Sequence, residues 1–127
     1  MVLDRVFVSL GGLSGCLAVA AGAFAAHALR DRLSADLLDV FQTGATYQMY
    51  HALALVGVGI LLSRFSVSGS AWLAAAGWLF VAGTLLFSGS LYALALSGTR
   101  WLGAITPIGG VAFLLGWLAL AIGIWRD

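Results

Sequence analysis

The sequence predicts an all-α membrane protein, in which four transmembrane helices form an antiparallel bundle with a short interfacial amphipathic helix. The first observation is composition: of 127 residues, 62% are hydrophobic and 9% are charged, and the mean hydropathy is +1.06. A soluble domain of this size cannot bury that much apolar surface. The second observation is that the charged residues are confined to a few positions, which leaves four uncharged stretches long enough to cross a bilayer. We expect one domain over residues 1–127.

Charged residues mark the ends of these stretches. Runs of 24, 24, 35 and 25 residues without Asp, Glu, Lys or Arg follow Arg5, Asp39, Arg64 and Arg100. A helix needs about 20 apolar residues to span the hydrocarbon core. The third run is too long for one straight span, so its Ser-rich start, 65–69, is predicted to be a loop. The predicted spans are residues 6–28, 44–63, 71–96 and 106–125.

Between the first two spans the sequence changes to an amphipathic pattern. Leu33, Leu37 and Phe41 recur every four residues, while charged residues occupy the other faces. Ser34 is suited to cap the N-terminus of a helix. We therefore predict a short helix at about 34–42, which lies in the interface because it is too short and too charged to span.

Local signals also mark the ends of the last two spans. Gly98 stands where a glycine C-cap of the third helix is expected. Thr106 followed by Pro107 is typical of an N-cap and a first helical residue. These residues predict where the third helix ends and the fourth begins.

Two long stripes of small residues run along the first and fourth spans. Small residues let helix backbones approach closely in a membrane. Each stripe can therefore pack against another helix of this chain, or dock onto a second copy or a larger membrane complex. The first stripe consists of Gly11, Gly15, Ala18, Gly22 and Ala26, and the second of Gly109, Ala112, Gly116, Ala119 and Gly123.

The segment 41–55 is the most polar part of any predicted span. Within it, Gly44, Gln48 and His51 are spaced so that they share one stripe of a helix. An unpaired amide or imidazole costs roughly several kcal/mol in hydrocarbon. We therefore expect this stripe to face the interior of the bundle.

The predicted topology brings polar side chains from all four spans into the same half of the bilayer. The first span ends on the side where the second begins, and the third arrives on the side from which the fourth departs. The opposite half is almost wholly apolar side chains and glycine. The predicted cluster, which holds a ligand or only fixes the helix arrangement, comprises His27, Tyr47, Gln48, His51, Ser88, Ser90, Tyr92 and Thr106.

Five runs of residues, in order along nearly the whole chain, resemble the signature runs of one family. They are Gly22–His27, Phe41–Leu55, Phe87–Tyr92, Ile105–Gly110 and Gly116-Trp117. The family is that of the small four-span membrane proteins catalogued as domain of unknown function 423. The resemblance implies four helices and an integral membrane location. It carries over no activity, cofactor or catalytic residue.

The residues favour a non-enzymatic role, with no catalytic residue, metal or cofactor. No Asp or Glu lies within a predicted span to orient a histidine base beside Ser88, Ser90 or Thr106. We expect a structural or accessory protein of the bacterial cell (inner) membrane, with the lipid bilayer as its immediate partner. The arginines divide equally between the two sides, which leaves the orientation open.

Two other classes of function stay open, while a nucleic-acid partner and an internal disulfide are excluded. One open alternative is a small transporter or channel-like protein whose polar vestibule lies at one leaflet. The other is a haem- or metal-binding redox protein that uses His27 and His51, since imidazole is a common metal ligand. A net charge of +1 with scattered arginines excludes nucleic acid as a partner. A single cysteine, Cys16, excludes an internal disulfide.

Overall fold

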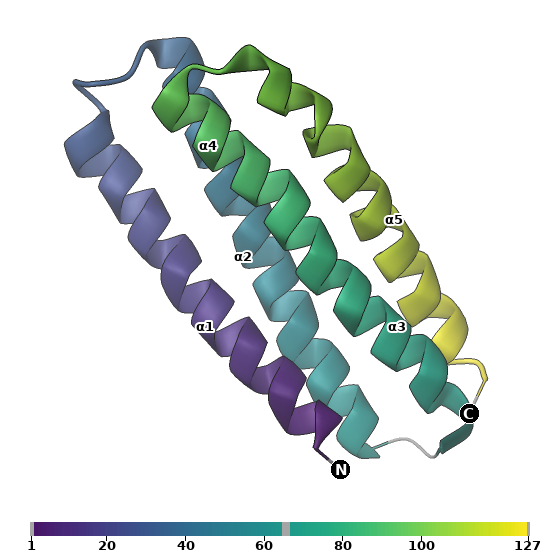
Figure 1. The fold of residues 1–127 in the computed structure, drawn as a ribbon. Coiled ribbons are helices and arrows are strands. Elements are labelled where there is room, and N and C mark those ends of the chain that lie inside the picture. Colours follow the sequence, from purple (N-terminus) through teal and green to yellow (C-terminus); the bar gives the residue numbers. More distant parts are fainter. Residues whose placement is uncertain (1, 65–66, 127) are drawn as a thin grey trace.

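The computed structural model describes residues 2–64 and 67–126, and it consists of helices joined by short connections (Figure 1). The π-helical segment η1 ends the first helical stretch, a second π-helical segment, η2, lies between α3 and α4, and a 3₁₀ turn, η3, precedes the last helix. The elements in order are α1 (Leu3–Phe24), η1 (Ala25–Leu29), α2 (Ala35–Arg64), α3 (Val67–Gly83), η2 (Thr84–Ser88), α4 (Gly89–Ser97), η3 (Arg100–Ala104) and α5 (Thr106–Gly123).

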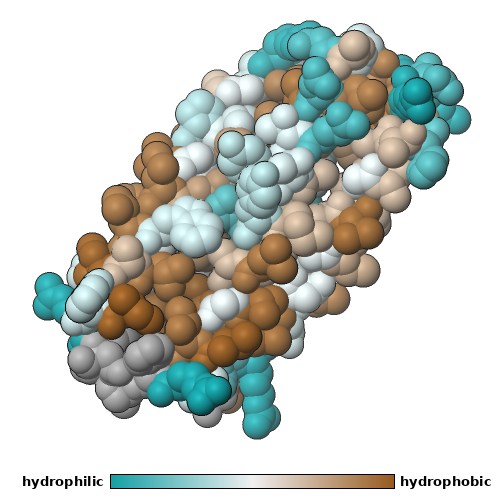
Figure 2. All heavy atoms as spheres, turned by 180° about the vertical axis from the view of Figure 1, so that it is seen from behind, coloured by the Kyte–Doolittle hydropathy of each residue, from teal (hydrophilic) through white to brown (hydrophobic). Residues whose placement is uncertain are grey.

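In the part of the chain that the structure describes, four helical stretches are long and apolar enough to cross a membrane, which confirms the all-α, four-span prediction. They cover Leu3–Leu29, Ala35–Arg64, Ser70–Ser97 and Arg100–Gly123. Figure 1 shows consecutive stretches running in opposite directions, with both chain termini at the same end of the molecule. Figure 2 shows strongly hydrophilic residues gathered at the two ends, with a largely apolar flank between them.

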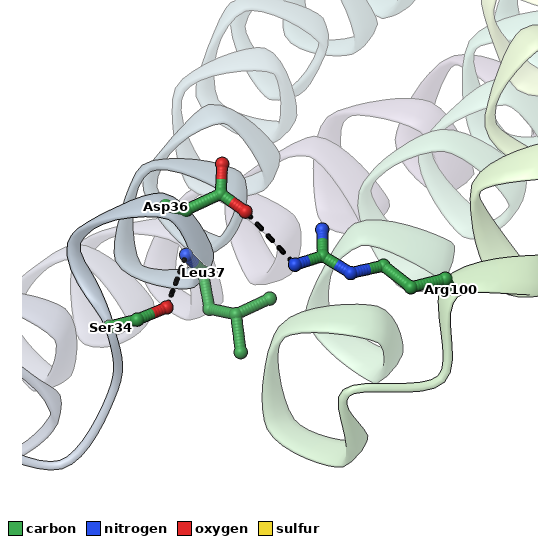
Figure 3. Close-up of polar contacts among 4 residues, drawn as sticks. All are labelled: Ser34, Asp36, Leu37 and Arg100. Atoms are coloured by element: carbon green, nitrogen blue, oxygen red, sulfur yellow. Dashed lines mark hydrogen bonds and ion pairs between the residues drawn. The ribbon is translucent and has the colours of Figure 1, made fainter.

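The separate interfacial helix predicted at about 34–42 is not present. Instead, α2 runs without a break over 30 residues, and the amphipathic segment forms its first turns. Ser34 does cap this helix, because its Oγ accepts a hydrogen bond of 3.2 Å from the Leu37 backbone N–H (Figure 3). Phe41 is buried against Ala25 of η1 and Ala95 of α4. The apolar face of the segment therefore packs on the bundle, so nothing favours a break before the span.

The predicted ends of the last two spans are mostly confirmed. Gly98 adopts a left-handed conformation with φ +70° and ends α4 as its C-cap. Pro107 lies in the first turn of α5, but the N-cap is Ile105 rather than Thr106, whose hydroxyl bonds to another helix. The loop predicted at 65–69 is wrong for its last three positions, since α3 begins at Val67; residues 65 and 66 lie outside the described residues.

Small residues set the close approach of neighbouring helices. At Gly11 of α1, an added Cβ would lie 2.7 Å from the Ala52 carbonyl oxygen of α2. At Gly109 of α5, it would lie 2.3 Å from the Phe87 backbone nitrogen of η2. The two stripes therefore make contacts within the chain at these positions, with α1 along α2 and α5 along α3 and η2.

The half of the bundle near the termini is filled by an apolar core. Phe7, Val58, Ala76 and Phe80 are fully buried, and the ring of Phe7 packs where Gly77 leaves room for it. The core consists of Phe7, Leu55, Val58, Leu62, Leu73, Ala76, Phe80, Phe113 and Ala119. The buried polar side chains, Gln48, His51, Ser88 and Ser90, are not part of this core.

We predict that Gly109→Ala lowers the free energy of unfolding by about 1–3 kcal/mol, because the methyl group collides with backbone atoms and forces α5 away from η2. Gly12→Ala is the matched control, since a Cβ at Gly12 meets nothing within 4 Å. It should change stability by less than about 0.5 kcal/mol. Unfolding in mixed detergent micelles measures both values, and equal effects of the two substitutions would contradict this packing.

Candidate functional site

The side-chain amide of Gln48 joins three helices inside the membrane. Its Nε2 donates hydrogen bonds of 3.2 Å to both the carbonyl oxygen and the Oγ of Ser14 on α1. Its Oε1 accepts a hydrogen bond of 2.6 Å from the Tyr92 hydroxyl on α4. Gln48 is 7% exposed, so both ends of the amide are satisfied by the protein rather than by water.

Two serines extend the hydrogen bonding to α5. Ser88 in η2 is fully buried, and its Oγ donates to the Gly44 carbonyl of α2 at 2.7 Å. Ser90 Oγ donates to the Phe87 carbonyl at 3.0 Å and lies 2.6 Å from Thr106 Oγ1 of α5. With Gln48, these residues make up what we call the polar network (Ser14, Gly44, Gln48, Ser88, Ser90, Tyr92 and Thr106), three separate groups of hydrogen bonds that together link all four spans.

His51 lies one turn further along α2 and has both ring nitrogens occupied. Its Nδ1 is 2.7 Å from the Tyr47 carbonyl, and its Nε2 is 3.1 Å from the indole nitrogen of Trp117 on α5. A carbonyl oxygen only accepts and an indole N–H only donates. The ring therefore carries its proton on Nδ1 and is neutral.

Aromatic rings enclose the His51 imidazole. The Phe113 ring stacks on it with centroids 3.5 Å apart and planes 8° from parallel. Phe80 and Trp117 lie at centroid distances of 5.4 and 5.9 Å. His51 is 3% exposed, so this face of α2 is fixed against α5 by one hydrogen bond and a ring stack.

An open groove lies between α2 and α5, directly beside the His51 ring. Its volume is about 750 Å³. The walls are apolar and aromatic, with the phenol rings of Tyr47 and Tyr50 on the α2 side. Its residues are Tyr47, Tyr50, His51, Leu53, Phe87, Pro107, Gly110, Val111, Phe113, Leu114 and Trp117.

A smaller cavity of about 210 Å³ lies between α1 and the α3–η2 stretch. Ser14, Gln48 and Thr84 contribute its polar surface. Thr84 Oγ1 is buried without a hydrogen-bond partner among residues 2–64 and 67–126. The cavity thus borders the polar network at the one place where a buried hydroxyl group stays unsatisfied within the described chain.

Most, but not all, of the residues predicted as a cluster lie together. Gln48 and Tyr92 bond directly, as do Ser90 and Thr106, while Ser88 bonds separately to the Gly44 carbonyl of α2. Tyr47 contributes its carbonyl to His51, but its side chain is 40% exposed and lines the groove.

His27 is the misplaced member of the predicted cluster. It lies in η1 at the end of the first span, and its side chain is exposed. Its position along the first span predicts the same depth in the membrane as the polar residues, but the rotation of the helix turns its side chain away from them. Pairing of His27 with His51 around a metal is also disfavoured by His51 itself, because its Nε2 lone pair already accepts the Trp117 N–H.

Three important residues were missing from the predicted cluster. Ser14 bonds to Gln48, while Trp117 and Phe113 hold His51. Serine and tryptophan are common in membrane helices, so neither stands out in its own span. The available signal was the requirement of Gln48 and His51 for partners, which demands a donor or acceptor at matching depth on a neighbouring helix.

An ion pair joins the first residue of η3 to the first turn of α2. Arg100 Nη2 donates to Asp36 Oδ2 at 3.0 Å, with both side chains about two-thirds exposed (Figure 3). An exposed pair of this kind contributes little to stability, on the order of 0–1 kcal/mol. It closes the end of the bundle above the buried network.

Comparison with known proteins identifies relatives along almost the whole chain. The family model described as "Protein of unknown function (DUF423)" matches residues 21–110. A UPF0382 membrane protein of Staphylococcus saprophyticus is 49% identical over 124 residues, which are 96% of this chain and 98% of that protein. UPF0382 membrane proteins of Staphylococcus epidermidis and Staphylococcus aureus are 49% and 45% identical, over 93% and 96% of this chain and 93% and 97% of theirs. No solved structure matches the chain.

We predict a measurable energetic coupling between Gln48 and Tyr92. In a double-mutant cycle with Gln48→Leu and Tyr92→Phe, the coupling energy should be about 0.6 kcal/mol and at most about 1.7 kcal/mol, the average and the maximum for interhelical hydrogen bonds in a membrane protein. Gln42→Leu is the matched control, because Gln42 is exposed on the same helix. It should leave the unfolding free energy nearly unchanged. A coupling energy of zero would show that the Tyr92–Gln48 hydrogen bond does not form.

We also predict the tautomer of His51. Nitrogen NMR of protein labelled at histidine should give Nδ1 the chemical shift of a protonated nitrogen and Nε2 that of an unprotonated one. Trp117→Phe removes the indole N–H and should shift the Nε2 resonance while leaving His27 unaffected. Protonation on Nε2 in the unsubstituted protein would be incompatible with the bond from Trp117.

Proposed function

The chain belongs to the DUF423 family of bacterial membrane proteins of unknown function, and from its site we propose that it is a non-enzymatic accessory protein that binds a lipid-soluble molecule. The observation that carries this proposal is the aromatic groove of about 750 Å³ between α2 and α5. Small-molecule sites in proteins are typically about 300–1,000 Å³, apolar and supplied with a few polar groups. The groove fits this description.

The groove opens at the level of the membrane-spanning helices, which limits what can enter it. Its lining residues lie on α2, η2 and α5, all within candidate spans. Molecules dissolved in the bilayer reach such an opening directly, whereas ions and water-soluble substrates do not. The apolar walls therefore favour a hydrophobic ligand over the transported ion or solute of a channel.

Nearby hydrogen bonds support binding rather than chemistry. Ser88 and Ser90 are candidate nucleophiles by residue type, yet the hydroxyl group of each donates a hydrogen bond to a backbone carbonyl. His51 has its Nε2 lone pair bonded to Trp117, so it is not poised to take a proton. These groups fix the helices around the groove, and a fixed groove binds with less loss of conformational entropy.

We expect a bulky side chain in the groove to prevent ligand retention. Leu114 is 66% exposed and lines the groove, so Leu114→Trp should fill it. Leu115→Trp is the matched control, because Leu115 is 49% exposed at the same depth but lies outside the groove lining. Solvent extraction and mass spectrometry of protein purified in mild detergent should find a retained lipid-soluble molecule. Its amount should fall about tenfold in Leu114→Trp only.

The same purified samples provide the control for folding. Both tryptophan variants should unfold at temperatures close to that of the unsubstituted protein, since both side chains face lipid. If all three proteins retain the same lipids in the same amounts, the groove is not a binding site and the proposal is wrong.

A further inference from the structure

We infer that the ligand of the α2–α5 groove is a molecule of the quinone class, with a planar ring, carbonyl acceptors and a long apolar tail. This inference rests on the proposed function and specifies its ligand. It concerns binding alone and requires no electron or proton transfer by the protein.

The groove leaves two hydrogen-bond donors unused. The Tyr47 and Tyr50 side chains line it and are 40% and 56% exposed. Within residues 2–64 and 67–126, neither phenol hydroxyl has a hydrogen-bond partner, although both rings make aromatic contacts. A hydroxyl without a partner in hydrocarbon is costly. A ligand with an acceptor at this position removes that cost.

The other polar groups of the groove are already taken. The Trp117 N–H is donated to His51 Nε2, and the His51 Nδ1–H is donated to the Tyr47 carbonyl. The remaining polar groups are therefore the two phenols, which can donate to an acceptor on the ligand. A quinone ring, whose carbonyl oxygens only accept, matches this arrangement.

Depth in the membrane separates a quinone from a phospholipid. Asp39 and Arg64 flank the uncharged part of α2, at an axial separation of about 37 Å. The midpoint between them falls at His51, so Tyr50 lies about 2 Å and Tyr47 about 7 Å from the centre of the span. Phospholipid ester groups stay about 15 Å from the bilayer centre, at the edge of the hydrocarbon. Even with the tyrosine side chains directed towards the N-terminal end of α2, their hydroxyls lie within the hydrocarbon.

The walls suit a flat ring with a chain attached. The rings of Tyr47 and Phe87 lie 4.8 Å apart, and those of Phe87 and Phe113 lie 5.4 Å apart, each pair tilted. Such surfaces favour offset stacking with a planar head group. Because the groove is open rather than enclosed, an isoprenoid tail can continue into the bilayer. A sterol carries a hydroxyl group instead of carbonyl acceptors, and methyl groups project from one face of its saturated rings.

The test compares two ligands that differ only in their acceptors. A benzoquinone with a ten-carbon chain is titrated into the purified protein in micelles, beside a benzene ring with the same chain. Binding is measured as the saturable rise in unfolding temperature. The quinone should bind more tightly than the benzene, and Tyr47→Phe with Tyr50→Phe should weaken quinone binding at least about fivefold, since two hydrogen bonds are lost.

The variants separate the two hypotheses. Because neither phenol hydroxyl bonds within the described chain and each is costly in hydrocarbon, the double phenylalanine variant should be at least as stable as the unsubstituted protein without ligand, and its affinity for the benzene should not change. Leu114→Trp should abolish quinone binding and Leu115→Trp should not. If both ligands bind equally and the tyrosine substitutions have no effect, the quinone assignment is wrong while the groove remains a binding site. If neither ligand stabilises the unsubstituted protein more than Leu114→Trp, the binding function is wrong as well.

Discussion

The hydrogen bonds of the Gln48 side chain determine how this bundle is assembled. A carboxamide in the hydrocarbon core must find both donors and acceptors within the protein, because water is absent there. Gln48 does so with Ser14 on α1 and Tyr92 on α4. The first three spans can satisfy this one side chain only in a narrow range of rotations and heights. The network thus specifies an arrangement that apolar packing alone would leave open, because lipid tails are as apolar as leucine.

Small residues make the remaining polar contacts possible. A Cβ at Gly44 would lie 2.9 Å from the ring of Tyr92, so the glycine lets α2 approach α4 closely, and Ser88 bonds to the Gly44 carbonyl at this contact. Gly109 brings α5 against η2 in the same way, which sets Thr106 beside Ser90. The π-helical turn in η2 adds one residue to the helix here, a feature that often occurs at functional sites. The polar contacts therefore depend on the close approach of the helix backbones that the glycines allow.

Sequence reasoning predicted the number of spans and the face of α2 that is buried, because hydrophobic length and helical period carry that information directly. Gln48 and His51 lie inside as expected. It failed where the outcome depends on helix rotation or on relative stability. His27 has the right depth but the wrong direction, and the amphipathic turns before α2 continue into the span because Phe41 packs on η1 and α4. The partners Ser14 and Trp117 do not stand out in their own helices. They can be recognised only from the need of Gln48 and His51 on α2 for hydrogen-bond partners.

The groove follows from the same pattern of packing. Since α1 packs along α2, and α5 packs along α3 and η2, the seam between α2 and α5 is closed by side chains rather than by backbone contact. His51, Phe113 and Trp117 fill the floor of that seam and leave its outer part to the rings that line it. A purely structural role would not require two tyrosines in the lining of this groove, since phenylalanine would pack as well without the cost of an unpaired hydroxyl. The polar network holds the walls in place, and the phenols are the groups it leaves available. A gap between helices needs no hydrogen-bonding groups, whereas a binding groove needs walls fixed by satisfied polar groups and a few unsatisfied groups that can bond to the ligand.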